Sequence, residues 1–108
     1  MGKREEQLGE NEAAFREMNE TVADIASLTA VAKTTLFHCE CGDESCVVNV
    51  ALTYEQYEEV RAEADRFVVA PGHVRSEAER IVAQHTEWWI VEKFGDAGEI
   101  AEETDPRA

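Results

Sequence analysis

Residues 34–52 read TTLFHCECGDESCVVNVAL, and the fold is organised around this stretch. Its two halves, 34–41 and 46–52, each predict a β-strand. One face of the second strand is expected to carry Cys46, Val48, Val50 and Leu52. Between the halves, Gly42-Asp43 supplies the residue types of a turn. The stretch therefore predicts two strands joined by a turn that carries cysteines.

All three cysteines of the chain, Cys39, Cys41 and Cys46, lie in this stretch. In an extended segment residues two apart share a face, so Cys39 and Cys41 should present their thiols side by side, and the turn can bring Cys46 back to the same centre. Three thiolates suit zinc, which prefers tetrahedral sulfur and nitrogen ligands. An odd cysteine number argues against a disulfide scaffold, and an iron–sulfur cluster normally takes a fourth cysteine. The pattern favours a zinc knuckle, while redox chemistry or no special role for the thiols stays open.

A tetrahedral zinc site needs one more ligand, and three histidines compete for that position. His38 directly precedes Cys39 in the predicted strand, so its side chain is expected on the opposite face. His85 lies in a predicted loop with no other ligand type nearby except Glu87. His73 follows a Pro-Gly turn at the end of a predicted strand, where a side chain can reach a neighbouring knuckle without distorting the sheet. His73 is therefore the preferred fourth ligand, with Asp43 or water as rivals.

Two of the predicted helices flank this stretch. Residues 11–28 predict an amphipathic helix that covers the sheet or pairs with a second copy of the chain. Its apolar seam consists of Phe15, Met18, Val22 and Ile25. Thr53 is expected to open a central helix that ends near Arg66, with Gln56 closing a capping box.

The rest of the chain predicts further strands and a short helix. Residues 67–70 and 87–93 are expected to be strands, and the second is expected to be central because it is apolar on both faces. A short helix is expected from Ser76, with Glu79 as a capping-box partner. The fold class is therefore α+β: a small antiparallel sheet with an N-terminal amphipathic helix, one central helix and a Cys-rich knuckle. The predicted division is a flexible N-terminus at 1–10, a single domain at 11–94 and an acidic, mobile tail at 95–108.

Composition and charge narrow the range of functions that this protein can have. With 108 residues, 44% of them hydrophobic, the chain has the length of one domain, and no apolar run approaches the roughly 18–20 residues of a membrane span. The charged N-terminus has no apolar signal core, so a cytoplasmic location is expected. The net charge of −14 disfavours general DNA or RNA binding, which depends on Lys and Arg contacts to phosphate, and suits a basic protein partner.

Groups of residues spread along the chain also match a pattern seen elsewhere. They are Asn11-Glu12, Phe15-Arg16-Glu17, Asn19-Glu20, Cys39-Glu40-Cys41-Gly42-Asp43 with Cys46, Leu52-Thr53, Tyr57-Glu58, Val60-Arg61, Arg66-Phe67-Val68-Val69-Ala70-Pro71-Gly72-His73 and Val91-Glu92-Lys93. Together they resemble a family of short actinobacterial-type hypothetical proteins with a Cys-x-Cys-Gly-Asp-x-x-Cys knuckle and a downstream Pro-Gly-His turn. The resemblance spans nearly the whole chain from residue 11. It implies that the cysteines and the Pro-Gly-His turn belong to one design, which favours His73 over His38, and it implies no activity.

These observations predict a small acidic zinc-stabilised module for protein interaction or regulation, without catalysis. Its expected metal ligands are Cys39, Cys41, Cys46 and His73. The alternative is a thiol-based redox or metal sensor in which the same cysteines release zinc on oxidation. A zinc enzyme is disfavoured because a catalytic site keeps an open coordination position, whereas three thiolates and an imidazole close it. The identity of the partner and the choice between monomer and homodimer stay open.

Overall fold

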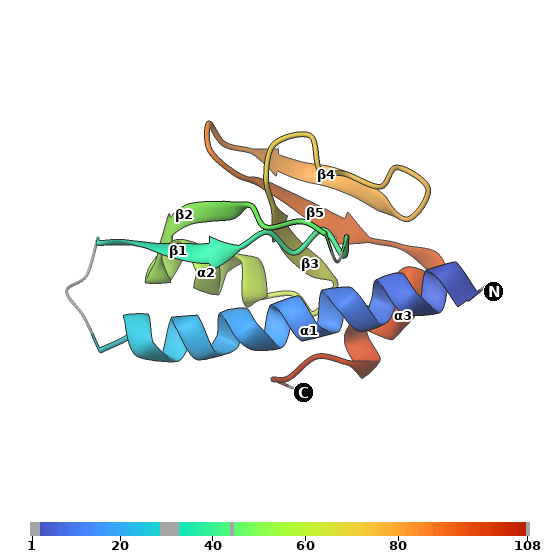
Figure 1. The fold of residues 1–108 in the computed structure, drawn as a ribbon, viewed down its shortest axis with the longest axis horizontal. Coiled ribbons are helices and arrows are strands. Elements are labelled where there is room, and N and C mark those ends of the chain that lie inside the picture. The colour runs from blue at the N-terminus through green and yellow to red at the C-terminus, as the bar shows by residue number, and fades with distance from the viewer. Residues whose placement is uncertain (1–2, 29–32, 44, 108) are drawn as a thin grey trace.

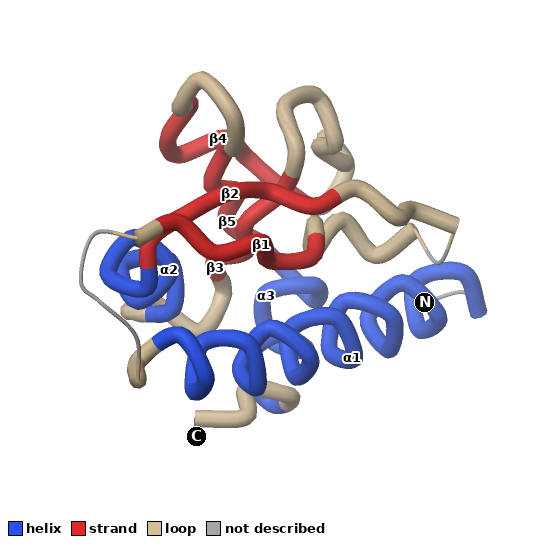
Figure 2. Tube along the Cα trace, turned by 60° about the vertical axis from the view of Figure 1, so that its left-hand side comes forward, coloured by secondary structure: helices blue, strands red, loops and turns tan. Residues whose placement is uncertain are grey.

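The predicted α+β architecture is confirmed in the computed structural model, which describes residues 3–28, 33–43 and 45–107, with side chains from residue 9 onward. The elements of this described part are α1 (Lys3–Ala26), β1 (Thr34–His38), β2 (Asn49–Thr53), α2 (Tyr54–Arg61), β3 (Arg66–Val69), β4 (Glu79–Gln84), β5 (Trp89–Lys93) and α3 (Gly95–Glu103). The strands gather on one side and α1 runs beneath them along the length of the molecule (Figures 1 and 2). Among the described residues, no helix has both the length and the apolar character needed to cross a membrane.

The hairpin predicted over 34–52 is present, with shorter strands. β1 pairs with β2 in antiparallel register from Thr34↔Thr53 to His38↔Asn49. After His38 the backbone changes partner: the amide of Cys39 still donates to the carbonyl of Val48 (3.0 Å), but the amide of Glu40 donates to Val68 in β3 (2.8 Å). The cysteine-bearing segment therefore leaves one sheet and joins the edge of the other.

The second sheet has the strand order β3-β5-β4, so the central position predicted for residues 87–93 is confirmed. The short helix predicted from Ser76 is wrong, because β4 begins at Glu79 and pairs with β5. The side chain of Glu79 accepts a hydrogen bond from the amide of Arg75 (2.8 Å) and forms an ion pair with Lys93. Pairing of the segment that follows Glu79 with β5, including Ile81 opposite Val91, overrides the local capping pattern.

The central helix begins as predicted and ends early. Thr53 caps α2: its hydroxyl accepts from the amide of Gln56 (3.1 Å), and the Gln56 side chain accepts from the amide of Thr53 (2.9 Å). The helix ends at Arg61 rather than near Arg66, which already belongs to β3. Tyr57 is fully buried, so α2 packs one face against the strands.

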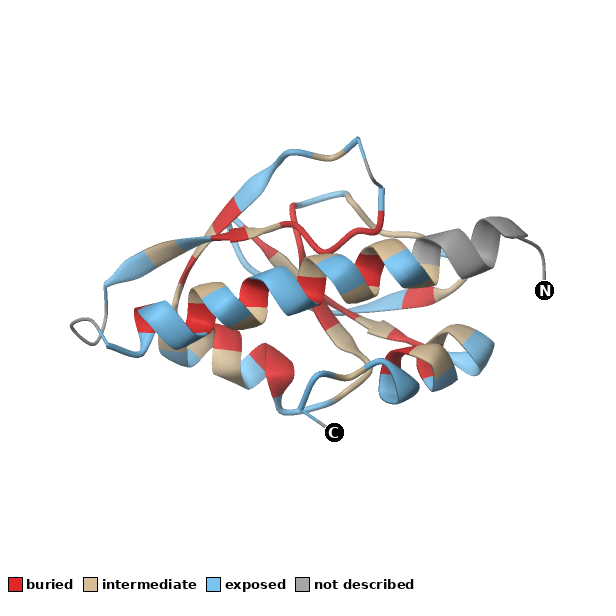
Figure 3. Cartoon of the chain, turned by 60° about the horizontal axis from the view of Figure 1, so that its bottom comes forward, coloured by how far each residue is buried: buried red, intermediate tan, exposed pale blue. Residues whose placement is uncertain are grey.

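Of the apolar seam predicted for α1, only Val22 packs against the hydrophobic core. Met18 and Ile25 are 46% and 63% exposed, and Phe15 and Val22 are only half-buried. Figure 3 shows that buried positions recur along α1. Four of the buried residues directly follow a seam residue in sequence, and the fifth lies about one turn before the first of those four. They are Glu12, Arg16, Asn19, Ala23 and Ala26. The predicted burial of the seam against the sheet is therefore wrong, because the layer above α1 offers carbonyls and a buried carboxylate that polar side chains bind.

Both ends of the described chain are more helical than expected. α1 begins at Lys3 rather than at residue 11, and α3 occupies much of the segment predicted as a loose tail. The guanidinium of Arg16 in α1 donates to the carbonyl of Ala101 in α3 (2.7 Å), and Asp105 forms an ion pair with Arg61. These contacts tie the last residues to the core, while the predicted mobility of the two ends stays a prediction.

Candidate metal centre

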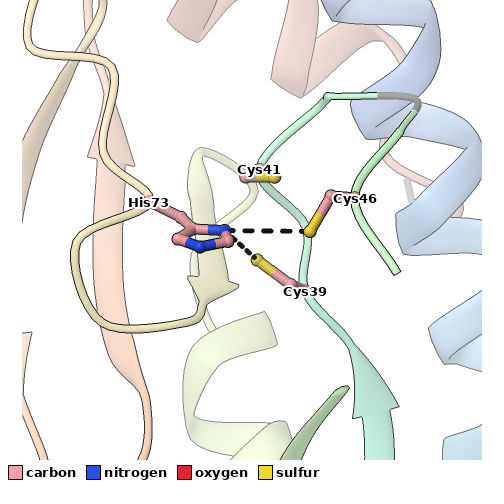
Figure 4. Close-up of side chains that lie close together, drawn as sticks. All are labelled: Cys39, Cys41, Cys46 and His73. Carbon is pink, nitrogen blue, oxygen red and sulfur yellow. Dashed lines mark hydrogen bonds between the residues drawn. The ribbon is translucent and has the colours of Figure 1, made fainter. Parts of the chain in front are cut away.

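Four side chains converge at the point where the two sheets meet (Figure 4). Their metal-binding atoms all lie within 4.8 Å of one another, and they belong to Cys39, Cys41, Cys46 and His73. The three thiols are free, with no disulfide. The structure thus brings together all four residues that the sequence predicted as ligands.

The knuckle itself is a tight reversal of the chain after Cys41. Gly42 has a φ of 83°, in the left-handed region that favours glycine. The amide of Cys46 then donates to the carbonyl of Asp43 (2.9 Å), which returns the third thiol to the first two. The carboxylate of Asp43 accepts from the amide (2.9 Å) and hydroxyl (2.7 Å) of Ser45, which lowers its pKa. Asp43, the rival ligand, therefore stabilises the turn and is not among the four converging side chains.

His73 is positioned by the Pro71-Gly72 turn that follows β3. The amide of His73 donates to the carbonyl of Ala70 (3.0 Å), and Gly72 has a φ of 86°, so the turn has the proline and glycine positions of a type II turn. The amide of Ala70 also donates to the sulfur of Cys39 (3.1 Å). One residue thus fixes both a thiol and the imidazole relative to the same strand.

Two of the distances between these ligand atoms match a tetrahedral zinc ion. The Nδ1 atom of His73 lies 3.5 Å from the sulfur of Cys39 and 3.7 Å from that of Cys46. Zinc bonds of ordinary length to sulfur and nitrogen, set at tetrahedral angles, separate those two atoms by about 3.6 Å. The imidazole therefore points its Nδ1 atom toward the sulfurs. The spacing between this nitrogen and the two sulfurs is the one that a shared zinc ion requires.

The three thiols do not ionise alike. A hydrogen bond from Cys39 lowers the pKa of Cys41 to about 4. The same bond, together with burial, raises the pKa of Cys39, and burial raises that of Cys46. Without a metal ion, we therefore expect one thiolate in the cluster and protons on the other two sulfurs. A second negative charge at this spacing would be repelled by the first. A divalent cation would remove the repulsion and allow all three thiols to ionise.

Sequence reasoning missed the residue that holds this segment from behind. Glu40, between the first two cysteines, points to the opposite face and is fully buried. Its carboxylate accepts from the side chain of Asn19 (2.9 Å), the hydroxyl of Tyr57 (2.9 Å) and the amide of Val68 (3.0 Å). Burial nevertheless raises its pKa. Strand alternation was the available signal, since it places this carboxylate opposite the thiols, toward α1.

Two further side chains bind backbone carbonyls of the knuckle. The guanidinium of Arg75 donates to the carbonyl of Cys41 (3.2 Å), and the side-chain amide of Asn11 donates to that of Gly42 (2.9 Å). Neither contact has a signal in the sequence, because each joins residues more than thirty positions apart.

The other two histidines lie away from the thiols. The ring of His38 contacts Phe15 on α1, with ring centroids 4.3 Å apart, and His85 stacks on Trp88 at 3.8 Å. The expectation that His38 faces away from the cysteines is confirmed.

Comparisons of the chain with protein-family models, curated proteins and solved structures found no match. Membership of the family that the sequence resembles therefore stays a prediction. The function has to be inferred from the geometry of the site.

Proposed function

We propose that this protein is a small acidic interaction module whose fold is stabilised by one zinc ion bound by Cys39, Cys41, Cys46 and His73. The observation that supports the proposal most strongly is the convergence of four ligand atoms within 4.8 Å, with sulfur-to-nitrogen distances of tetrahedral size. Among the common divalent metals, zinc is the one that this donor set of three sulfurs and one imidazole favours.

The same donor set favours a structural role over a catalytic one. Four protein ligands fill a tetrahedral zinc, whereas a catalytic zinc keeps a position for water or substrate. Cys39 is fully buried and Cys41 is 4% exposed, so two of the four bonds would lie inside the core. Because the unfolded chain has no assembled site, zinc binding would contribute its free energy to folding.

The interaction role is inferred from charge. The net charge of −14 favours a basic protein partner over nucleic acid, and a reducing compartment such as the cytoplasm would keep the three thiols available for metal. Binding to such a partner would weaken as salt is raised, because ions screen exposed charges within about 8–10 Å at ordinary ionic strength. Binding that is insensitive to salt would count against a charge-driven interface.

A redox or metal sensor is the second candidate, and the exposure of Cys46 favours it. Cys46 is half-buried while the other two thiols are buried, so an oxidant meets it first. Hydrogen peroxide would take two electrons from the thiolates of Cys46 and Cys41 and, with two protons, become two waters, while a disulfide forms and zinc leaves.

Elemental analysis of protein purified without added zinc tests the proposal. We expect one zinc per chain and a marked fall in melting temperature when a strong chelator removes it. Absence of zinc, with chelator leaving the melting temperature unchanged, would refute the zinc module. Mild peroxide separates the two candidates: a sensor releases zinc and forms a disulfide, whereas a structural site retains its metal under the same treatment.

A further inference from the structure

A cavity of about 390 Å³ lies apart from the knuckle, between the first half of α1, the end of β5 and α3. Its apolar wall consists of Ala13, Phe67, Ala97, Ile100 and Ala101. The volume falls in the range of small-molecule pockets, about 300–1,000 Å³, which combine apolar walls with a few placed polar groups. No cysteine or histidine of the proposed metal centre lines it.

The polar groups of this cavity are buried charges. Lys93 lines it and forms ion pairs with Glu12, which also lines it, and with Glu79. The side chains of Lys93, Glu12 and Glu79 are 3%, 9% and 0% exposed. Burial raises the pKa of Glu79 to about 7 and lowers that of Lys93 to about 7. One ammonium group therefore faces two carboxyl groups, so Lys93 cannot neutralise both when they are ionised.

The rim of the cavity adds to this negative charge. Glu77 and Asp96 both line it and are exposed. Arg75 is the one further cation among the described lining residues, and its guanidinium is directed to the carbonyl of Cys41 in the knuckle. The described lining therefore carries three carboxylates, those of Glu12, Glu77 and Asp96, against the two cations of Lys93 and Arg75, and this balance favours a cationic ligand over an anionic one.

We propose that this cavity binds a small primary amine with an apolar body. The ammonium group lies between the carboxylates of Glu12 and Asp96, and the body packs on Ala13, Ala97 and Ile100. Apolar walls argue against a bare metal ion, which would lose its water ligands without gaining enough oxygen ligands. This proposal is independent of zinc at the knuckle.

Three probes of one chain length test the charge of the ligand: hexylammonium, 1-hexanol and hexanoate. Each is added to the full-length, ¹⁵N-labelled protein while amide chemical shifts are followed. We expect hexylammonium alone to saturate, with a dissociation constant of about 1 mM or lower, and to shift the amides of Ala13, Ala97 and Ile100. The proposal is overturned if hexanol or hexanoate binds as tightly as hexylammonium, or if none of the three binds.

Two substitutions, each with a matched control, place the binding. Asp96→Asn should weaken hexylammonium by about threefold, as expected for one partly exposed charge pair, whereas Glu99→Gln on the same helix should leave it unchanged. Ala97→Leu fills the cavity and should abolish binding, whereas Ala62→Leu, at an exposed position outside it, should not. Equal effects of Asp96→Asn and Glu99→Gln overturn the site. Should Ala97→Leu fail to fold, the comparison of Asp96→Asn with Glu99→Gln tests the site by itself.

Discussion

The knuckle and the buried face of α1 are both polar regions inside the fold, and they differ in how their charge is neutralised. At the knuckle, three thiols and an imidazole face one another, and the guanidinium of Arg75 donates to the carbonyl of Cys41 rather than to a thiol. At the buried face of α1, Glu12 of the helix and Glu79 both pair with Lys93 of β5. Arg16 of the helix donates to the carbonyls of Ala64 (2.6 Å) and Ala101.

Buried charge is tolerated only where it is compensated. The α1 region pairs Lys93 with Glu12 and Glu79 from within the chain, so these ion pairs form on folding without an added ion. The knuckle can be fully ionised only with a cation from outside. The comparison predicts that metal controls the stability of one region and that side-chain pairing controls the other.

The largest expected effect is at the knuckle. Cys41→Ser should abolish zinc retention and cause the largest fall in melting temperature, because it removes a thiolate whose charge the metal needs. His73→Ala should weaken zinc retention less, since water can take the place of the imidazole. Zinc content after gel filtration and thermal unfolding measure both. Equal retention in the two variants would mean that thiolate charge does not hold the ion.

The next largest effect is expected from Lys93. Lys93→Met leaves Glu12 and Glu79 facing each other without a cation, and should cost about 3–5 kcal/mol of unfolding free energy. Zinc content should not change, because Lys93 is not in the knuckle. The triple variant with Glu12→Gln and Glu79→Gln should recover most of the loss in urea unfolding. Failure of the triple variant to recover stability would show that packing, not charge, explains the defect.

The pH dependence of stability should report on Glu79. Burial raises its pKa from 4.5 to about 7, so the folded protein binds this proton more tightly than the unfolded chain does. The stability from this group is complete below about pH 4.5 and is lost as pH rises to about 7, a fall on the order of 1–3 kcal/mol. Glu79→Gln should remove that slope between pH 5 and 7. An exposed carboxylate that does not act on Glu79 serves as control, since Glu99→Gln should keep the slope of the wild type.

The smallest effects separate the two faces of α1. Asn19→Ala removes the side chain that donates to Glu40 and to the carbonyl of His38 (2.7 Å), and should cost about 1–3 kcal/mol. Met18→Ala, at the adjacent exposed position, should change the unfolding free energy by less than about 0.5 kcal/mol. A larger loss for Met18→Ala would point to burial of the outer face in a homodimer, which sedimentation would then detect.

The elements that were predictable rest on local rules. Alternation in an extended chain placed Cys39 and Cys41 together and His38 opposite, because neighbouring side chains of a strand must point to opposite faces. The Thr53–Gln56 capping box and the Pro-Gly turn before His73 were recognisable because each is complete within a few residues.

The elements that were missed depend on distant partners. An apolar seam on α1 was the natural prediction, yet Met18 is exposed while Arg16 and Asn19 are buried. Their partners lie in α3, in the loop after α2 and next to the knuckle, and no local pattern reveals them. The same holds for β4, since the pattern from Ser76 to Glu79 reads as a helix start until β5 is present to pair with it.

Spacing and turn chemistry therefore specified the fold class, the knuckle and its candidate ligands, because covalent geometry sets which near neighbours share a face. Packing alone selected the buried side of α1, added β4 and created the cavity beside Lys93. Those features depend on which hydrogen-bonding groups and charges the assembled core presents. A buried polar side chain is stable only where it meets such a partner. Partners of that kind are set by contacts between residues far apart in the chain, which exist only once the chain has folded.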